Sequence, residues 1–320
     1  MNAMILCAGY GTRLHPLTDA LPKPLVEIAG FTLLDDILAH LADQGVTLAV
    51  VNGSWLSSML REHLERRTSP PATVFQHEEQ PLGTAGAVRR ALQLLGERFL
   101  VVYGDNLTRQ PLAPLTALHE TLSAEVTISL APTGDPSSKG IVLTDPRGRV
   151  TSFREKPPAE LAGSNMASSG MLLCEASCVA DLADGVFSDF GLDVLPSMLS
   201  AGRMVAAEAT GGYTIDIGTL ESYLLACHHV LSGRVIPLAG RKIPADGRLL
   251  ESPVPADVTL NGTAWMGKSV RVGSGSRLEN CVVLEGAVIG RNCSLRNALI
   301  LPGRAVPDGT EADDKYLSVF

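Results

Sequence analysis

The chain of 320 residues is poor in aromatic side chains and has no excess of positive charge. Only 4% of its residues are Phe, Trp or Tyr, and its formal net charge is −8. Surfaces that bind nucleic acids use basic patches to neutralise phosphates and aromatic rings to stack on bases. The composition therefore argues against a nucleic-acid partner and favours small molecules.

Long apolar runs are also missing. No stretch reaches the roughly 18–20 residues that span a bilayer, and the N-terminus has neither the basic region nor the cleavage site of a signal peptide. We therefore expect a cytoplasmic protein with no membrane partner. The apolar fraction of 45% is still ample for a core, and the length allows one large domain and a smaller one.

Cysteine is scarce, with six residues scattered along the chain. Only Cys174 and Cys178 lie close together in the sequence. A structural zinc site would need a second pair at ligand spacing, and a disulfide would need an oxidising compartment. We expect reduced, partly buried thiols.

A glycine-rich turn follows the first apolar run, residues 4–8. Gly9 and Gly11 allow the backbone to turn tightly and expose amides that cradle phosphate oxygens. Arg13 supplies a planar set of donors suited to phosphate, and Lys23 lies between two prolines that stiffen its backbone. The turn alone is a common pattern, but together with Lys23 it indicates a phosphate-binding segment.

Helical and strand patterns alternate through the first third of the chain. Residues 33–42, 55–65 and 84–95 have helical apolar spacing, and residues 48–51, 74–75 and 99–103 are apolar runs typical of buried strands. This alternation predicts an α/β, Rossmann-like, mostly parallel sheet with helices on both faces. Ligands of such sheets bind beyond the carboxyl ends of the strands, where the glycine-rich turn and Asp105 are expected.

Several polar residues at predicted strand ends have two possible roles. Asp105 and Asp216 each end an apolar strand, where a carboxylate either caps the next element or binds a metal, and capping is the commoner role. Glu155 and Lys156 are either a solvated charge pair or ligand contacts. The amide of Gln80 can offer a donor and an acceptor to a base edge.

These segments together resemble the sugar-1-phosphate nucleotidyltransferases, also called NDP-sugar pyrophosphorylases. The segments that carry the resemblance follow one another in the family's order and cover nearly all of residues 1–232. They are residues 8–27, Pro81–Ala87, Val102–Asp105, Phe153–Pro157, Gly191–Pro196 and Ile215–Thr219. Residues 78–86 are most similar to guanylyltransferases that act on mannose 1-phosphate or a related sugar.

The resemblance implies a reaction and a set of site residues. An NTP and a sugar 1-phosphate would give an NDP-sugar and pyrophosphate, with Mg²⁺ on Asp105 and Asp216 and with Arg13 and Lys23 as catalytic residues. The implied nucleotide-binding residues are Ala8, Gly9, Gly11, Thr12, Arg13, Lys23, Gln80, Gly83 and Thr84. The implied sugar-phosphate-binding residues are Tyr103, Gly140, Glu155, Lys156 and Ser168.

Two departures from the family pattern leave the substrates open. Gln80 stands where the guanylyltransferases often have an acidic residue, so GTP is expected but UTP, dTTP and ATP stay possible. Ser168–Gly170 stands where many members have Asn-Ala-Gly, so the usual asparagine contact is missing. The sugar could be mannose, glucose, a heptose or a cyclitol.

The C-terminal region has an apolar period of six residues. The period runs through Val254, Leu260, Met266, Val272 and Leu278 and, after one five-residue step, through Val283, Ile289, Leu295 and Leu301. Such a period predicts a parallel β-helix of two to three coils, left-handed by its resemblance to hexapeptide-repeat domains. We expect a catalytic domain over residues 1–232, a linker over 233–253 and the β-helix over 254–320. Because a short coil stack has exposed ends, we also expect a homo-oligomer.

Three other functions fit the sequence less well. Residues 262–269 match the Walker A pattern, but strand-like residues follow them where a P-loop needs a helix. A regulatory subunit with the same fold but no chemistry is weakened because all the charged site residues are present. An acyltransferase of the hexapeptide type lacks its usual histidine, since no His follows residue 229.

Overall fold

The computed structural model describes the backbone of residues 1–319 and the side chains of residues 1–312. Its contacts divide the chain into two compact units. The sheet unit comprises Met1–Tyr10 and Ile37–Thr214, and the β-helix unit comprises Gly11–Asp36 and Ile215–Phe320. The glycine-rich turn thus continues from the first unit into the second. The domain boundaries at residues 232 and 253 stay a prediction, and residue 320 lies outside the described residues.

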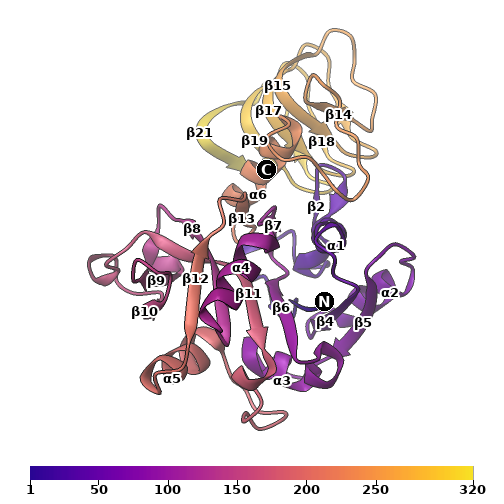
Figure 1. Ribbon diagram of the computed structural model, residues 1–320. Helices are drawn as coiled ribbons and strands as arrows, with labels where there is room; N and C mark the ends of the chain where they lie inside the picture. The colour runs from indigo at the N-terminus through magenta and orange to yellow at the C-terminus, as the bar shows by residue number, and fades with distance from the viewer. Residues whose placement is uncertain (320) are drawn as a thin grey trace. The chain divides into compact units, whose positions relative to one another are not determined.

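Four parallel strands form one half of the sheet, with β5 at its edge (Figure 1). They are β1 (Asn2–Leu6), β4 (Leu48–Gly53), β5 (Ala72–His77) and β6 (Arg98–Tyr103), in the order β6-β1-β4-β5. The intervening helices are α1 (Leu33–Asp43), α2 (Ser57–Glu65) and α3 (Gly83–Leu95). The alternation of strands and helices expected from the sequence is confirmed, with α2 beginning two residues later than predicted.

The second half of the sheet is mainly antiparallel. Strand β11 (Met166–Glu175) runs antiparallel to β6, to β8 (Val126–Pro132) and to β9 (Gly140–Thr144). Strand β10 (Val150–Glu155) pairs with β9, and β12 (Val205–Ala209) pairs in parallel with β8. Helix α4 (Leu112–Leu122), a π-helical turn (Phe190–Val194) and α5 (Leu195–Ser200) complete this half. The α/β class is confirmed.

The core of the sheet unit joins the two halves. Met4 of β1, Val101 of β6 and Leu172 of β11 pack in one apolar cluster with Val88 of α3, all at most 2% exposed. The six cysteines are free and buried. Within residues 1–319, no helix is long and apolar enough to cross a membrane.

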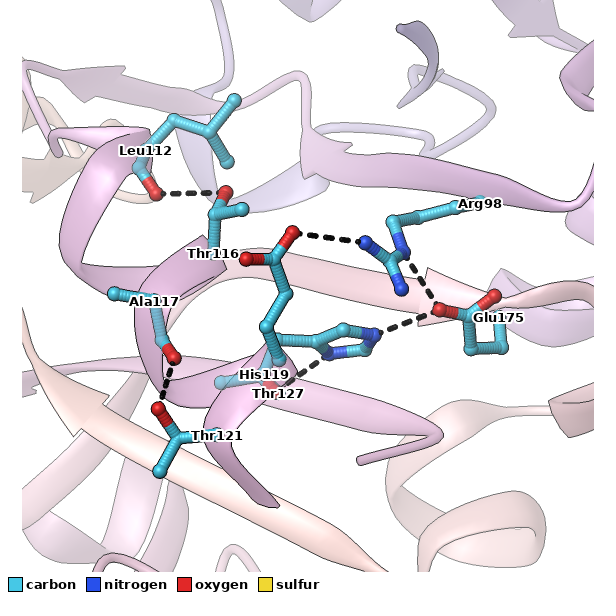
Figure 2. A network of polar contacts seen from close by, with 9 residues as sticks. Arg98, Leu112, Thr116, Ala117, His119, Thr121, Thr127 and Glu175 are labelled. Carbon is cyan, nitrogen blue, oxygen red and sulfur yellow. Dashed lines mark hydrogen bonds and ion pairs between the residues drawn. The ribbon is translucent and has the colours of Figure 1, made fainter. Parts of the chain in front are cut away.

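A buried histidine connects four elements at the amino end of β6 (Figure 2). The His119 ring contacts Thr127 Oγ1 through Nδ1 (2.8 Å) and Glu175 Oε1 through Nε2 (3.0 Å), and Arg98 Nε donates to the same Glu175 oxygen (2.6 Å). Burial raises the pKa of Glu175, but the hydrogen bonds from His119 and Arg98 outweigh it and leave that pKa lowered. Tyr103 lies at the opposite end of β6, so this network is structural.

The C-terminal strands stack as coils of a parallel β-helix (Figure 1, orange to yellow). One sheet contains β14 (Arg248–Leu250), β15 (Thr259–Met266), β17 (Arg277–Val283), β19 (Ser294–Ile300) and β21 (Glu311–Val319). A second contains β16 (Arg271–Val272), β18 (Val288–Ile289) and β20 (Ala305–Val306). Leu260, Leu278 and Leu295 align in register, as the six-residue period predicted.

One position of the predicted period is wrong. Val283 aligns with Ile300, and Ile289 aligns with Val306, so the five-residue step occurs in each of these coils. Ile300 therefore stacks in the coil core in place of Leu301. The shortened corners contain Asn280 and Asn297 with φ of 51° and 48°, a conformation that asparagine tolerates better than most residues.

The Walker A match belongs to the β-helix. Residues 259–266 form β15, and the turn after it leads into β16 with no helix between residues 254 and 312. A Cβ at Gly262 would lie 2.2 Å from Asn280 Oδ1, which explains the glycine by coil packing. The rejection of a P-loop is confirmed.

Candidate active site

The predicted site residues are divided between the two units. Arg13, Lys23 and Asp216 belong to the β-helix unit, together with Gly11 and Thr12. The other predicted residues belong to the sheet unit. Each set is described within its own unit.

Lys23 is a buried cation in the β-helix unit. It begins a short 3₁₀-helix (Lys23–Leu25), and the preceding Pro22 is extended with φ of −66°. The Lys23 side chain is 10% exposed, and its Nζ lies 3.6 Å from Oδ1 of Asp216, the last residue of β13 (Thr214–Asp216). A lysine is rarely buried unless it is paired. The fold therefore brings a predicted phosphate ligand beside a predicted metal ligand.

Glycines allow the other groups of this set to approach. A Cβ at Gly218 would lie 3.1 Å from Asp216 Oδ1 and 3.2 Å from Arg13 Nη2. The side chains of Asp216 and Arg13 therefore both lie close to residue 218, where a larger residue would crowd them. Gly11 has φ of 66°, and its carbonyl accepts a hydrogen bond of 2.8 Å from Thr18 Oγ1. Arg13 and Thr12 are exposed in the 3₁₀-helix Thr12–Leu14 that follows.

The N-terminal segment of the β-helix unit, residues 11–36, contacts helix α6 of the same unit. The hairpin of β2 (Glu27–Ile28) and β3 (Phe31–Thr32) follows Lys23, and the Tyr223 hydroxyl donates to the Glu27 carbonyl (2.9 Å). Tyr223 belongs to α6 (Leu220–Leu231), which begins with a capping box of Thr219 and Ser222 immediately after Asp216–Gly218. Helix α6 therefore connects the Asp216 loop, which immediately precedes it, with the β2–β3 hairpin, which its Tyr223 contacts.

Buried polar side chains hold the loops after β1 and β5 in the sheet unit. Asn52 Oδ1 accepts from Cys7 N (2.7 Å), next to Ala8 and Gly9, while Asn52 Nδ2 donates to Glu78 Oε1 (2.8 Å). Glu78 Oε2 accepts from Leu82 N (3.0 Å). Asn52 and Glu78 are 2% and 1% exposed. Sequence reasoning missed this link; the only signal was a polar residue ending each apolar strand.

The predicted base-binding loop leads into α3. Gln80 is exposed on this loop, and Gly83 has φ of 75°. The amides of Ala85 and Gly86, in the first turn of α3, both donate to the Ser188 carbonyl at 2.9 and 3.0 Å. These two amides are therefore occupied by backbone, and the Thr84 hydroxyl bonds Asp189 Oδ2 and Phe190 N. The exposed Gln80 is the predicted side chain that can contact a ligand there.

Glu155 is a half-buried carboxylate enclosed by glycines. A Cβ at Gly140 would lie 2.9 Å from Glu155 Oε2, and one at Gly191 would lie 2.7 Å from it. Burial raises the Glu155 pKa, Lys156 opposes the shift, and the charge of Asp189 adds to it. The Lys156 side chain is 64% exposed, its Nζ is 3.6 Å from Glu155 Oε1, and its φ is 44°. Such a backbone conformation outside glycine is uncommon and is concentrated at functional sites.

Tyr103, Asp105 and Ser168 lie near the end of β6 and on β11. Burial raises the Tyr103 pKa, as do the charges of Asp189, Glu155 and Asp105, so the phenol stays a hydrogen-bond donor at neutral pH. Asp105 follows Gly104 between β6 and β7 (Asn106–Thr108), and Ser168 is partly buried on β11. Asn106, which the sequence did not single out, donates to the Ser169 carbonyl at 2.8 Å.

The described residues contain no group of three or more His, Cys, Asp and Glu side chains that could hold a metal. Mg²⁺ does not require one, because it commonly takes one or two carboxylates and completes its shell with phosphate oxygens and water. Asp216 is 24% exposed and lies beside Lys23. Its hard oxygen ligands fit Mg²⁺, and Asp105 has the same chemistry.

Comparisons with known proteins assign two families to the chain. A family described as nucleotidyl transferase matches residues 2–233, and one described as GlmU-like, C-terminal hexapeptide matches residues 243–314. A mannose-1-phosphate guanylyltransferase from Mycobacterium tuberculosis is 27% identical over 92% of this chain and 82% of its own length. A UTP–glucose-1-phosphate uridylyltransferase from Synechocystis is 26% identical over 96% of this chain and 86% of its own length.

A second guanylyltransferase and a solved structure are also similar to this chain. The mannose-1-phosphate guanylyltransferase catalytic subunit beta of Drosophila melanogaster is 31% identical over 84% of this chain and 72% of its own length. The crystal structure of HddC from Yersinia pseudotuberculosis complexed with GMP-PN has a TM-score of 0.60 and 28% identity. It covers 71% of this chain and 97% of its own. The chain belongs to the nucleotidyl transferase family and carries a GlmU-like C-terminal hexapeptide domain.

Proposed function

We propose that the protein transfers a guanylyl group from GTP to a sugar 1-phosphate and releases pyrophosphate, with Mg²⁺ as cofactor. The acceptor is a mannose-like sugar, a heptose or a cyclitol. Relatives named mannose-1-phosphate guanylyltransferase support guanine as the base, as does the HddC structure complexed with GMP-PN. The observation that carries the proposal is the buried Lys23, with its Nζ 3.6 Å from Asp216, in a chain of this family.

The chemistry is a displacement that needs no general base. A phosphate monoester has a second pKa near 6, so the acceptor phosphate is largely dianionic at pH 7 and attacks the α-phosphorus directly. Positively charged groups then stabilise the charge that builds up on the phosphates. We assign Arg13 to the leaving pyrophosphate, and Lys23 and Lys156 to the reacting phosphates.

The remaining residues bind and orient the substrates. The carboxylate of Glu155 accepts hydrogen bonds from sugar hydroxyls, while the Tyr103 phenol and the Gly140 backbone border the same region. Ala8, Gly9, Gly11, Thr12, Gln80, Gly83 and Thr84 contact the nucleotide. Asp105 and Asp216 would hold Mg²⁺, which neutralises phosphate charge when bound.

A pyrophosphate-release assay tests the function. GTP, UTP, dTTP and ATP are each combined with mannose, glucose, heptose and cyclitol 1-phosphates, with Mg²⁺ or with excess EDTA. We expect the strongest release with GTP and a mannose-type acceptor, and none with EDTA. Strong release from UTP and glucose 1-phosphate would replace the proposed substrates by those in the name of the Synechocystis relative.

Two further outcomes separate the rival functions. A protein that binds an NTP but releases no pyrophosphate with any acceptor would be a non-catalytic regulatory subunit. Tight binding of an acyl-CoA would instead favour an acyltransferase. Light scattering of the same preparation tests the expected homo-oligomer, and a monodisperse monomer would contradict it.

A further inference from the structure

Asp189 connects two segments of the sheet unit. One is residues 82–86, here called the nucleotide loop, and the other is the segment beside Glu155. Its Oδ2 accepts a hydrogen bond from Thr84 Oγ1 (2.9 Å), and its Oδ1 accepts from the amides of Gly191 (2.8 Å) and Leu192 (3.1 Å). Thr84 Oγ1 in turn accepts from Phe190 N (2.8 Å). The Thr84 hydroxyl therefore donates to the Asp189 side chain and accepts from the next backbone amide, although 105 positions separate Thr84 from Asp189 in the sequence.

The backbone on each side of this pair is packed without free space. A Cβ at Gly83 would lie 2.4 Å from the Ser188 carbonyl oxygen, and one at Gly86 would lie 2.6 Å from the Val186 oxygen. The Ser188 carbonyl also accepts the amides of Ala85 and Gly86. The first turn of α3 and residues 186–190 are thus in contact through their main chains, so one cannot shift without the other.

The contact continues from Asp189 to the sugar side. The Gly191 amide is held by Asp189, and a Cβ on Gly191 would lie 2.7 Å from Glu155 Oε2. The Gly191 backbone therefore touches the carboxylate that we assign to the sugar hydroxyls. A small movement of residues 189–191 displaces that carboxylate, because Gly140 closes its other side.

We propose that Asp189 is a positioning residue that couples the two substrate sites. Thr84, Asp189, Gly191 and Glu155 form a continuous chain of contacts, so a nucleotide that fixes Thr84 also fixes Glu155 in its sugar-binding position. The inference rests on the proposed function. Asp189 itself touches neither substrate, and its role is to transmit the position of the nucleotide loop to the sugar side.

The test uses an isosteric variant and a matched control in the full chain. Asp189→Asn keeps an oxygen for the amides of Gly191 and Leu192 but replaces the acceptor that faces Thr84 by an NH₂ group. The bond that the Thr84 hydroxyl donates is lost, and the NH₂ group could only compete with Phe190 N for the same hydroxyl oxygen. Asp135→Asn is the control, because Asp135 also accepts a backbone amide at the start of a short helix, that of Ser137 (3.1 Å).

Hydrogen exchange provides a readout that needs no acceptor substrate. Binding of GTP with Mg²⁺ to the unaltered protein should slow amide exchange in residues 150–156 as well as in residues 82–86. In Asp189→Asn, nucleotide should still protect residues 82–86 but no longer protect residues 150–156. In kinetics, KM for the sugar 1-phosphate should rise about tenfold, on the scale of measured couplings between sites, with kcat changed less than about threefold. Asp135→Asn should behave as the unaltered protein in both measurements.

The outcomes separate the inference from the function on which it rests. If Asp189→Asn transmits protection to residues 150–156 as the unaltered protein does, the coupling is refuted while guanylyl transfer stands. The same holds if KM for GTP and KM for the sugar 1-phosphate rise equally. If no NTP binds to the unaltered protein at all, both the proposed function and the coupling are wrong.

Discussion

The coils of the β-helix and the sheet unit bury different kinds of side chain. Between residues 254 and 312, the one buried polar residue is Ser276, and its hydroxyl is satisfied by the Gly290 carbonyl and the Cys293 amide. The sheet unit buries many more, and several of them bond a partner in a distant segment. They include Asn52, Glu78, Asn106, Gln110 and His119.

The difference shows what each region's sequence specifies. Stacked apolar residues such as Val283 and Ile289 specify the coils, because each new coil repeats the packing of the last. In the sheet unit the buried polar groups fix loops that no apolar pattern could fix, since an unsatisfied buried group is costly. Loss of an apolar side chain should therefore affect folding in the coils, whereas loss of a buried polar group should affect loops and activity.

The largest effect on stability is expected in the coils. Ile289→Ala removes a 1% exposed side chain that stacks between Val272 and Val306. Truncations of this kind destabilise proteins by roughly 2–5 kcal/mol. Denaturant unfolding should show this loss, and KM for both substrates should stay unchanged in the folded protein. Val288→Ala, the partly exposed neighbour in β18, is the control and should lose far less. Equal losses would show that the coil stack does not carry the stability.

The largest effect on activity is expected at Lys23. Lys23→Ala should lower kcat about a hundredfold or more, the scale seen when one preorganised stabilising donor is lost. The melting temperature should also fall, because the variant leaves the partly buried Asp216 carboxylate without the charge of Lys23, so kcat is measured well below the melting transition. Lys242→Ala, an exposed lysine of the linker, is the control. Activity within twofold of the unaltered protein would refute the assignment of Lys23.

A smaller effect on both properties is expected at Glu78. In the unaltered protein, the two Glu78 oxygens accept hydrogen bonds from Asn52 Nδ2 and Leu82 N. Glu78→Gln replaces one of these oxygens by an NH₂ group, which cannot accept, so one of the two hydrogen bonds is lost. The expected loss of stability is about 1–3 kcal/mol. KM for GTP should rise because the loop that contains Gln80 is released. The adjacent Glu79 is exposed, and Glu79→Gln should leave both quantities unchanged.

The same contrast explains how much could be predicted from the sequence. The coil positions followed from a period alone, and the single error, Leu301 for Ile300, came from a corner that is one residue shorter than six-residue spacing allows. The strands and helices of the parallel half also followed from local patterns. The polar ends of β6 and of β13 indicated Asp105 and Asp216 as candidates, but the proposal of metal binding in place of capping came from the family resemblance.

Long-range polar contacts could not be predicted in this way. The link from Thr84 to Asp189 joins the first turn of α3 to a loop with which it shares no pattern. The pair Asn52 and Glu78 depends on the order of β1, β4 and β5 in the sheet. The state of His228, near the end of α6, also depends on its burial in the fold. Burial lowers its pKa to about 4, and the nearby His229 adds to this, so the ring is neutral at pH 7 and does not act as a cation on the helix dipole.

His228 therefore gives the β-helix unit a sensitivity to acid that its apolar stack lacks. Its Nδ1 contacts Thr263 Oγ1 (2.7 Å), and its buried Nε2 has no hydrogen-bond partner among the described residues. Below pH 6.5 the unfolded chain binds a proton that the folded chain refuses until about pH 4, so stability falls as the pH falls through this window. The contribution lost at pH 5 is about 2 kcal/mol. His228→Gln, which cannot titrate, should show a smaller difference in unfolding free energy between pH 7 and pH 5, whereas His63→Gln on α2 should retain the full difference. An unchanged pH dependence in His228→Gln would mean that the ring is protonated in the folded state and acts on the end of α6 as a cation after all.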